Sequence, residues 1–128
     1  MKRLRRLVAI VLMFALCVQC IPSHAEEASV MSANVNSATI GISFSNGNAI
    51  CEACVIGRLG VTSISGALLL KKGSTIVRNW KVGTLTNILN VDRKAAVSKG
   101  TYTLTLNVNA FRNGVPETVN VSVTDTYK

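Results

Sequence analysis

The segment YTLTLNVNA, residues 102–110, alternates apolar and polar side chains without a break. One set consists of Tyr102, Leu104, Leu106, Val108 and Ala110, and the other of Thr103, Thr105, Asn107 and Asn109. A period of two predicts a β-strand with one face in a core and the other in solvent. A shift of one residue would expose the entire apolar set, so the register of this strand is well specified.

Six other runs between residues 38 and 123 share this period. They span residues 38–44, 49–55, 61–71, 75–81, 85–91 and 119–123. Turn residues separate them, most clearly Asn46-Gly47 and Asn113-Gly114, a dipeptide that closes hairpins through positive φ angles. About seven short strands without a helical period predict an all-β fold, a single immunoglobulin-like antiparallel β-sandwich. The charged stretch 92–94 is predicted to be an exposed turn.

The first 25 residues have the pattern of a signal peptide. Four basic residues precede the apolar run from Leu7 to Val18, and Ser23-His24-Ala25 has the small-residue spacing of a cleavage site. This apolar run is too short to cross a bilayer, so we expect cleavage, secretion and no stable membrane anchor afterwards. We therefore divide the chain into a signal peptide (1–25), a flexible N-terminal segment or edge strand (26–37) and a β-sandwich domain (38–128).

Removal of the signal peptide changes the composition of the chain. The full sequence of 128 residues has a formal charge of +8, four Cys and one His. The leader holds four of the 14 basic residues and none of the six acidic ones, so the remaining 103 residues carry +4. Cys17, Cys20 and His24 leave with it, and neither Cys follows the small residues of a lipidation site. The remainder is long enough for one domain with its own core.

The predicted mature chain has few residues suited to catalysis. Without His it lacks the base of Ser-His and Cys-His sites and the imidazole ligands of metal sites. A glycosidase needs two carboxylates across a cleft, but Glu52 has outward parity on its strand and Glu117 lies at a turn-to-strand junction. We expect a non-enzymatic protein with no catalytic residues, no cofactor and no metal. A small extracellular hydrolase that uses Glu52 or Glu117 is the less favoured alternative.

Cys51 and Cys54 form a Cys-x-x-Cys motif inside a predicted strand. Residues three apart in a strand lie ~10 Å apart on opposite faces, whereas a disulfide needs Cα atoms ~4.4–6.8 Å apart. A redox motif begins a helix, and zinc requires two further ligands. We therefore expect Cys51 to be a buried apolar residue and Cys54 to be free or outward-facing. A local bridge across a bulge and a disulfide-linked dimer through Cys54 are the alternatives.

Most basic residues of the predicted mature chain fall in two stretches. These are Lys71, Lys72, Arg78 and Lys81, followed by Arg93, Lys94 and Lys99. One interpretation is a basic edge that binds an anionic envelope polymer, an acidic glycan or a membrane surface. The other is protection of exposed strands from aggregation, which the modest charge of +4 favours. The leader and the lack of a set of stacking aromatics argue against nucleic acid as a partner.

Only five aromatic residues remain after cleavage. Phe44 and Tyr102 have inward parity, and Trp80 is expected in the core. Phe111 is the one whose parity indicates exposure, and one ring does not make a sugar-binding platform. The stretch Lys99-Gly100-Thr101-Tyr102 resembles the entry to the sixth strand of immunoglobulin-like domains, where the Tyr hydroxyl bonds back to the backbone. Tyr102 is thus either such a corner or one more inward aromatic.

Several short motifs resemble a family of small secreted proteins of Gram-positive bacteria to which no activity is assigned. The shared motifs are Ala49 with Cys51, Leu68 to Ser74, Trp80, Gly100 to Tyr102, and Glu117 to Val119 with the C-terminal Tyr127. They are spread over most of residues 38–128. The resemblance implies secretion and a β-sandwich, and it transfers no catalytic or binding residue.

These observations predict a secreted, non-enzymatic β-sandwich that acts as a binding or structural module at the cell exterior. Its expected partner is an extracellular or cell-envelope ligand. A secreted effector or bacteriocin-like protein that acts on anionic envelope surfaces is the main alternative.

Overall fold

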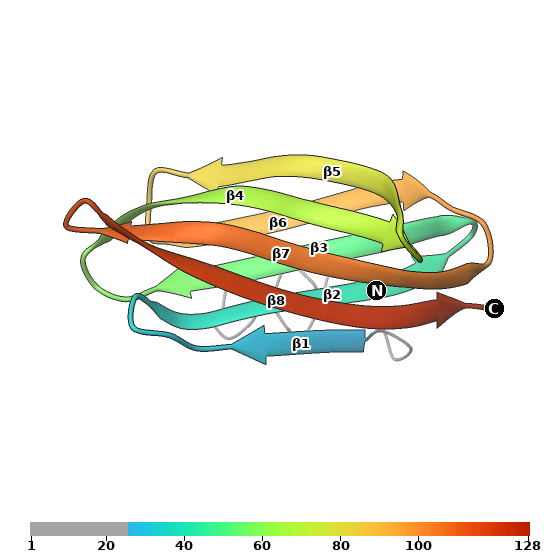
Figure 1. Ribbon diagram of the computed structural model, residues 1–128, viewed down its shortest axis with the longest axis horizontal. Coiled ribbons are helices and arrows are strands. Elements are labelled where there is room, and N and C mark those ends of the chain that lie inside the picture. The colour runs from blue at the N-terminus through green and yellow to red at the C-terminus, as the bar shows by residue number, and fades with distance from the viewer. Residues whose placement is uncertain (1–25) are drawn as a thin grey trace.

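The computed structural model describes residues 26–128, which form eight strands joined by short connections (Figure 1). The strands are β1 (Glu26–Val30), β2 (Val35–Ser45), β3 (Asn48–Gly57), β4 (Val61–Lys72), β5 (Thr75–Thr84), β6 (Ile88–Ala96), β7 (Gly100–Arg112) and β8 (Val115–Tyr127). The prediction of an all-β fold is confirmed for this part of the chain. The predicted signal peptide lies outside the described residues.

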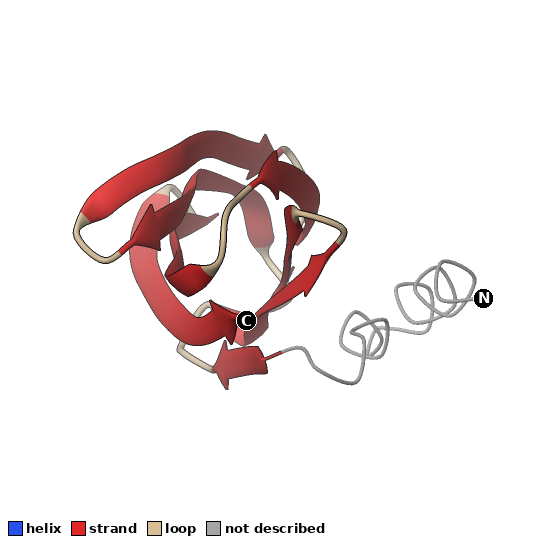
Figure 2. Ribbon diagram, turned by 90° about the vertical axis from the view of Figure 1, so that its right-hand side faces the viewer, coloured by secondary structure: helices blue, strands red, loops and turns tan. Residues whose placement is uncertain are grey.

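The strands form two antiparallel sheets of four strands that pack face to face. Sheet A has the order β1-β2-β3-β6, and sheet B has the order β5-β4-β7-β8. β1 and β2 lie against β8, and β5 lies against β6 at the other edge (Figure 2). The β-sandwich is therefore confirmed, with one strand more than expected, because residues 26–30 form the edge strand β1.

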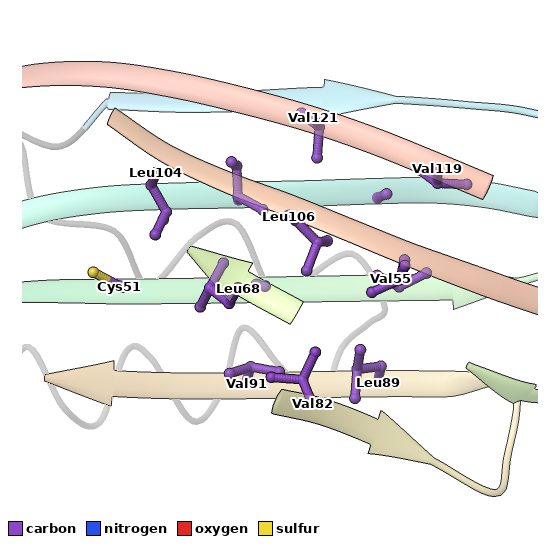
Figure 3. Close-up of a cluster of buried hydrophobic side chains, with 14 of the residues drawn as sticks. Cys51, Val55, Leu68, Val82, Leu89, Val91, Leu104, Leu106, Val119 and Val121 are labelled. Carbon is purple, nitrogen blue, oxygen red and sulfur yellow. The ribbon is translucent and has the colours of Figure 1, made fainter. Parts of the chain in front are cut away.

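The core lies between the sheets and contains the apolar residues of the alternating pattern. On β7 and β8 the buried residues are Tyr102, Leu104, Leu106, Val108, Ala110, Val119, Val121 and Val123. Figure 3 shows Val82 of β5 beside Leu89 and Val91 of β6, where the core closes at the edge of the sandwich. Removal of this apolar surface from water is the main favourable term in folding, about 25 cal/mol per Å².

The two Asn-Gly turns have the predicted conformation. Asn46 and Asn113 have φ angles of 53° and 55°, and the glycines that follow, Gly47 and Gly114, have φ angles of 78° and 75°. Positive φ at both central residues defines the hairpin turn whose twist matches that of the flanking strands. These turns set the β2–β3 and β7–β8 registers.

Gly66 lies in the middle of β4, where the sheet leaves no room for a side chain. A Cβ at this position would overlap the backbone oxygen of Asn107 and lie 2.6 Å from the Cα of Val108, both on β7. Glycine is thus required here because it lets the backbones of two central strands approach each other.

The prediction for the fifth run is wrong at both ends. Its expected span was 85–91, whereas β6 runs from Ile88 to Ala96 and includes the charged residues Asp92, Arg93 and Lys94. These three side chains are exposed because β6 is an edge strand of sheet A. Charges on an edge strand interrupt the apolar alternation, so residues 92–94 have the sequence pattern of a turn although they belong to a strand.

Candidate anion-binding end of the sandwich

Three connections and the C-terminus meet at one end of the sandwich, which we call the basic end. The connections are the β2–β3 turn, the β4–β5 turn at residues 73–74 and the β6–β7 loop at residues 97–99 (Figures 1 and 2). The C-terminus joins them because Tyr127 of β8 pairs with Gly100 at the start of β7. The topology of the two sheets thus gathers segments that are far apart in the sequence.

Three aromatic rings close the basic end beneath these connections. The ring of Phe44 stacks on that of Tyr127 at a centroid distance of 5.0 Å and contacts that of Tyr102 at 5.6 Å. The Tyr102 hydroxyl donates a hydrogen bond of 2.7 Å to the carbonyl oxygen of Ser98, and the Gly47 N–H donates one of 2.8 Å to the Tyr127 hydroxyl. Of the two alternatives for Tyr102, the one in which its hydroxyl bonds back to the backbone is observed, and the two tyrosines hold two connections in place.

Lys72 is positioned by the same group of residues. Its Nζ donates a hydrogen bond of 2.9 Å to the Ser98 hydroxyl and lies 5.7 Å from the centroid of the Tyr102 ring, within the range of a cation–π contact. Gly100 has a φ angle of 148°, and a Cβ there would lie 2.5 Å from Cε of Lys72. Glycine at position 100 therefore permits both the backbone conformation and the path of the Lys72 side chain.

Positive charge is concentrated around this end. The segments 71–78, 92–99 and 125–128 hold seven Lys and Arg residues and two side-chain carboxylates, those of Asp92 and Asp125. Within the described chain, the hydrogen bonds that Lys72, Arg78 and Arg93 donate go to a hydroxyl or to backbone carbonyl oxygens, and none goes to a carboxylate. Asp125 accepts a hydrogen bond of 2.8 Å from the Thr126 N–H.

Six of the seven basic residues named from the sequence lie on these segments. They are Lys71, Lys72, Arg78, Arg93, Lys94 and Lys99. Lys81 is the exception, because it lies nearer the other end of β5. Lys128 was missed, since only the pairing of β8 with β7 places it beside Lys99.

This arrangement is suited to anionic groups. Ammonium and guanidinium groups form charge-assisted hydrogen bonds with phosphate, sulfate and carboxylate oxygens. The Ser98 hydroxyl and the Tyr102 ring already hold the Lys72 side chain in place. Lys72 therefore loses little conformational entropy when an anion binds. Arg78 and Arg93 lie on the edge strands β5 and β6, where their charge also discourages pairing between sheets.

The carboxylates considered for catalysis lie on different sheets. Glu52 is on β3 of sheet A, opposite Asp92 of β6. Glu117 is on β8 of sheet B, opposite Ala110 of β7. The structure therefore does not bring Glu52 and Glu117 together.

Glu117 fastens the β1–β2 turn to β8, an arrangement that we call the Glu117 clasp. Its carboxylate accepts hydrogen bonds of 2.7 Å from the Ser32 hydroxyl, 2.6 Å from the Asn34 N–H and 3.2 Å from the Ala33 N–H. These bonds, led by that from Ser32 and aided by the charge of Arg58, lower the pKa of Glu117. The strand pattern around Glu117 does not indicate that its carboxylate binds the β1–β2 turn, because the donors lie more than 80 residues away in the sequence.

Cys51 is a free thiol buried in the core. Burial, followed by the charges of Asp92 and Glu52, raises its pKa to about 12, so the reactive thiolate is scarce. The prediction of a buried apolar Cys51 is confirmed, and a local bridge to Cys54 is not formed. Cys54 was expected to be free or outward-facing. It has the opposite parity on β3 and lies outside the core cluster, but it is buried and disulfide-bonded.

Two aromatic residues are placed differently from the predictions. Phe111, expected to be exposed, is half-buried and lies opposite Ser63 of β4, next to a register shift between Val61 and Ser63. Trp80, expected inside the core, is half-buried on the edge strand β5 and packs against the core from there.

Residues 26–128 contain no helix with the length and apolar character needed to span a membrane. In the same residues, no three His, Cys, Asp or Glu side chains lie together as possible ligands of a metal ion. What the fold and the site define is a two-sheet β-sandwich with a basic end. No protein-family model, curated protein or solved structure matches the chain.

Proposed function

We propose that the protein is a secreted, non-enzymatic binding module of the cell exterior that binds anionic polymers through its basic end. The observation that carries the proposal is the concentration of seven Lys and Arg residues on segments that one end of the sandwich brings together. A polymer with repeated phosphate or carboxylate groups can engage several of these cations at once. An effector directed to anionic envelope surfaces would use the same end.

We also propose that the domain is immunoglobulin-like. The order β5-β4-β7-β8 in one sheet and β2-β3-β6 in the other supports this relationship. The hydroxyl bond of Tyr102 to Ser98, four residues upstream and near the start of β7, is a second supporting feature. Such sandwiches bind ligands through connections at one end, and the basic end is built from such connections.

The proposal of a non-enzymatic protein is supported by the carboxylates. Glu52 and Glu117 belong to different sheets, and the hydrogen bonds of the clasp occupy Glu117. We expect no turnover of cell-wall or glycan substrates by the purified domain. A reaction that is lost when Glu52→Gln and Glu117→Gln are combined would instead assign the protein to the hydrolases.

The central test measures binding of residues 26–128 to inorganic polyphosphate as a function of salt concentration, with uncharged dextran as the reference polymer. Residues 26–128 contain all eight strands and the core that they enclose. We expect binding to polyphosphate only, with an affinity that falls linearly on a log–log plot as salt rises. The double variant Lys94→Gln, Lys99→Gln should reduce this slope by about two, since each lost contact removes about one released counterion.

The matched control is the double variant Lys81→Gln, Arg112→Gln. It removes the same charge from residues outside the segments of the basic end. Its salt slope should remain that of the wild type, although the lower net charge weakens long-range attraction slightly. Equal loss of slope in both variants would mean that net charge alone drives binding, and the basic end would then have no special role.

A further inference from the structure

The end of the sandwich opposite the basic end has exposed apolar side chains. Five of the six large hydrophobic residues that are exposed in the described chain lie on or beside its connections, and they are Met31, Leu59, Leu85, Ile88 and Val115. Leu59 and Leu85 are the most exposed, at 88% and 89%. Four connections, β1–β2, β3–β4, β5–β6 and β7–β8, carry these residues to one end, which we call the apolar end (Figure 1).

Hydrogen bonds tie these connections to one another. The Arg58 N–H donates to the Asn34 carbonyl at 2.9 Å, which joins the β3–β4 turn to the β1–β2 turn. The Gly57 N–H donates to the Asn87 carbonyl at 2.7 Å, which joins the same turn to the β5–β6 connection. The Glu117 clasp adds β8. The apolar side chains therefore stand on a connected framework, so their exposure is a property of the fold.

This pattern exceeds what an ordinary surface displays. Single exposed Leu residues are common and need no explanation, but several large apolar residues gathered at one place usually mark an interaction site. The exposed residues of this end other than Ile88 are 62–89% exposed, and each stands on a separate connection. A protein partner or a second copy would need a continuous complementary surface of about 800 Å² per partner.

The charges at the apolar end also discriminate among partners. The segments 30–36, 57–61, 84–89 and 110–117 hold two cations, Arg58 and Arg112, and one carboxylate, Glu117. The clasp already engages that carboxylate. The guanidinium of Arg58 donates to Ser32 and Asn36, whereas Arg112 is exposed and lies opposite Val115. Exposed apolar side chains with a cation beside them match the interface of a bilayer, where lipid headgroups accept hydrogen bonds from cations and turn backbones.

We propose that the apolar end docks on a lipid bilayer surface, with Leu59, Leu85, Met31 and Val115 inserted at the boundary between headgroups and acyl chains. In this position the exposed Arg112 faces the headgroup oxygens, whereas the guanidinium of Arg58 is held by the Ser32 carbonyl and the Asn36 side-chain oxygen. The interaction is independent of the basic end, which points away from the bilayer. The protein then has a lipid-binding end and an anion-binding end.

The test is co-sedimentation of residues 26–128 with phosphatidylcholine vesicles at high salt, where attraction between charges is screened. We expect binding that Leu85→Ser weakens about tenfold, because the transfer of one Leu side chain out of water accounts for about that factor. Leu59→Ser should have the same effect. Both residues are almost fully exposed, so neither substitution should unfold the domain.

The matched control is Ile76→Ser, which removes a 57% exposed apolar side chain beside the β4–β5 turn at the basic end. It should leave vesicle binding unchanged, as should Lys94→Gln with Lys99→Gln. Absence of vesicle binding would overturn the proposal, and so would an equal loss in the Ile76 and Leu85 variants. A dimer that forms without lipid and dissociates on Leu85→Ser would assign the apolar end to a second copy of the chain instead.

Discussion

The hydroxyl of Tyr102 connects the core to the basic end. Its ring is 2% exposed between the sheets, while its oxygen bonds to the Ser98 carbonyl of the β6–β7 loop. Tyr127 is partly buried against the core, and its hydroxyl accepts a hydrogen bond from the Gly47 N–H of the β2–β3 turn. Two tyrosines thus transmit the rigidity of the core to two separate connections.

Tyr102→Phe should destabilise the domain by about 1 kcal/mol, since it removes one hydrogen bond and keeps the ring. Urea unfolding measures this as a lower midpoint with an unchanged slope. Amide exchange should accelerate in residues 97–100 for Tyr102→Phe and in residues 46–48 for Tyr127→Phe. Identical exchange patterns in the two variants would show that the hydroxyls do not hold separate connections.

The Glu117 clasp makes stability depend on pH. Hydrogen bonds from Ser32, Asn34 and Ala33 lower the pKa of Glu117 below its ordinary value of 4.5. A carboxyl with a lowered pKa in the folded state stabilises that state above its unfolded pKa, and this contribution is lost as the pH falls through the folded pKa. Glu117→Gln should therefore lower the unfolding midpoint at pH 7, and the difference from the wild type should shrink below pH 4.5. A difference that stays constant down to pH 2 would contradict the role of the ionised clasp.

At the scale of the strands, close contact between β4 and β7 determines what position 66 tolerates. Gly66→Ala should destabilise the domain by about 3 kcal/mol or more, because the new Cβ overlaps the backbone at Asn107 and forces two central strands apart. Gly83→Ala on the edge strand β5 is the control, since its Cβ would lie 3.3 Å or more from its neighbours. Thermal unfolding compares the two variants. Similar stabilities would mean that β4 can move away from β7 at little cost.

The strands also show which parts of the fold alternation could predict. β7 was predictable because it has one buried and one solvated face along almost its full length. β8 was predictable only in its middle, where Val119, Val121 and Val123 are buried between exposed residues. The boundaries of β6 were not, because this edge strand exposes Asp92, Arg93 and Lys94. The sequence did not decide whether the residues of β1 form a flexible tail or an edge strand. The reason is that the apolar side chains of this five-residue strand are only half-buried.

At the scale of the whole molecule, the two ends of the sandwich differ in chemistry. Successive connections lie at opposite ends of the sandwich. Connections with exposed apolar residues and connections near basic residues therefore alternate along the chain. Most of the basic residues of the basic end could be identified from the sequence. Their proximity could not, because it depends on which strands pair. The same reason hid the apolar end, since its residues lie on four connections spread between residues 31 and 115.

The most direct test of the basic end is amide chemical-shift mapping of ¹⁵N-labelled residues 26–128 during titration with polyphosphate. We expect the largest shifts at Lys72 and Gly73, at Ser98 and Lys99, and at Lys128, with the turns that carry Leu59 and Leu85 unchanged. Shifts concentrated at the apolar end or on the outer faces of the sheets would contradict it, as would saturation without any change at the β6–β7 loop.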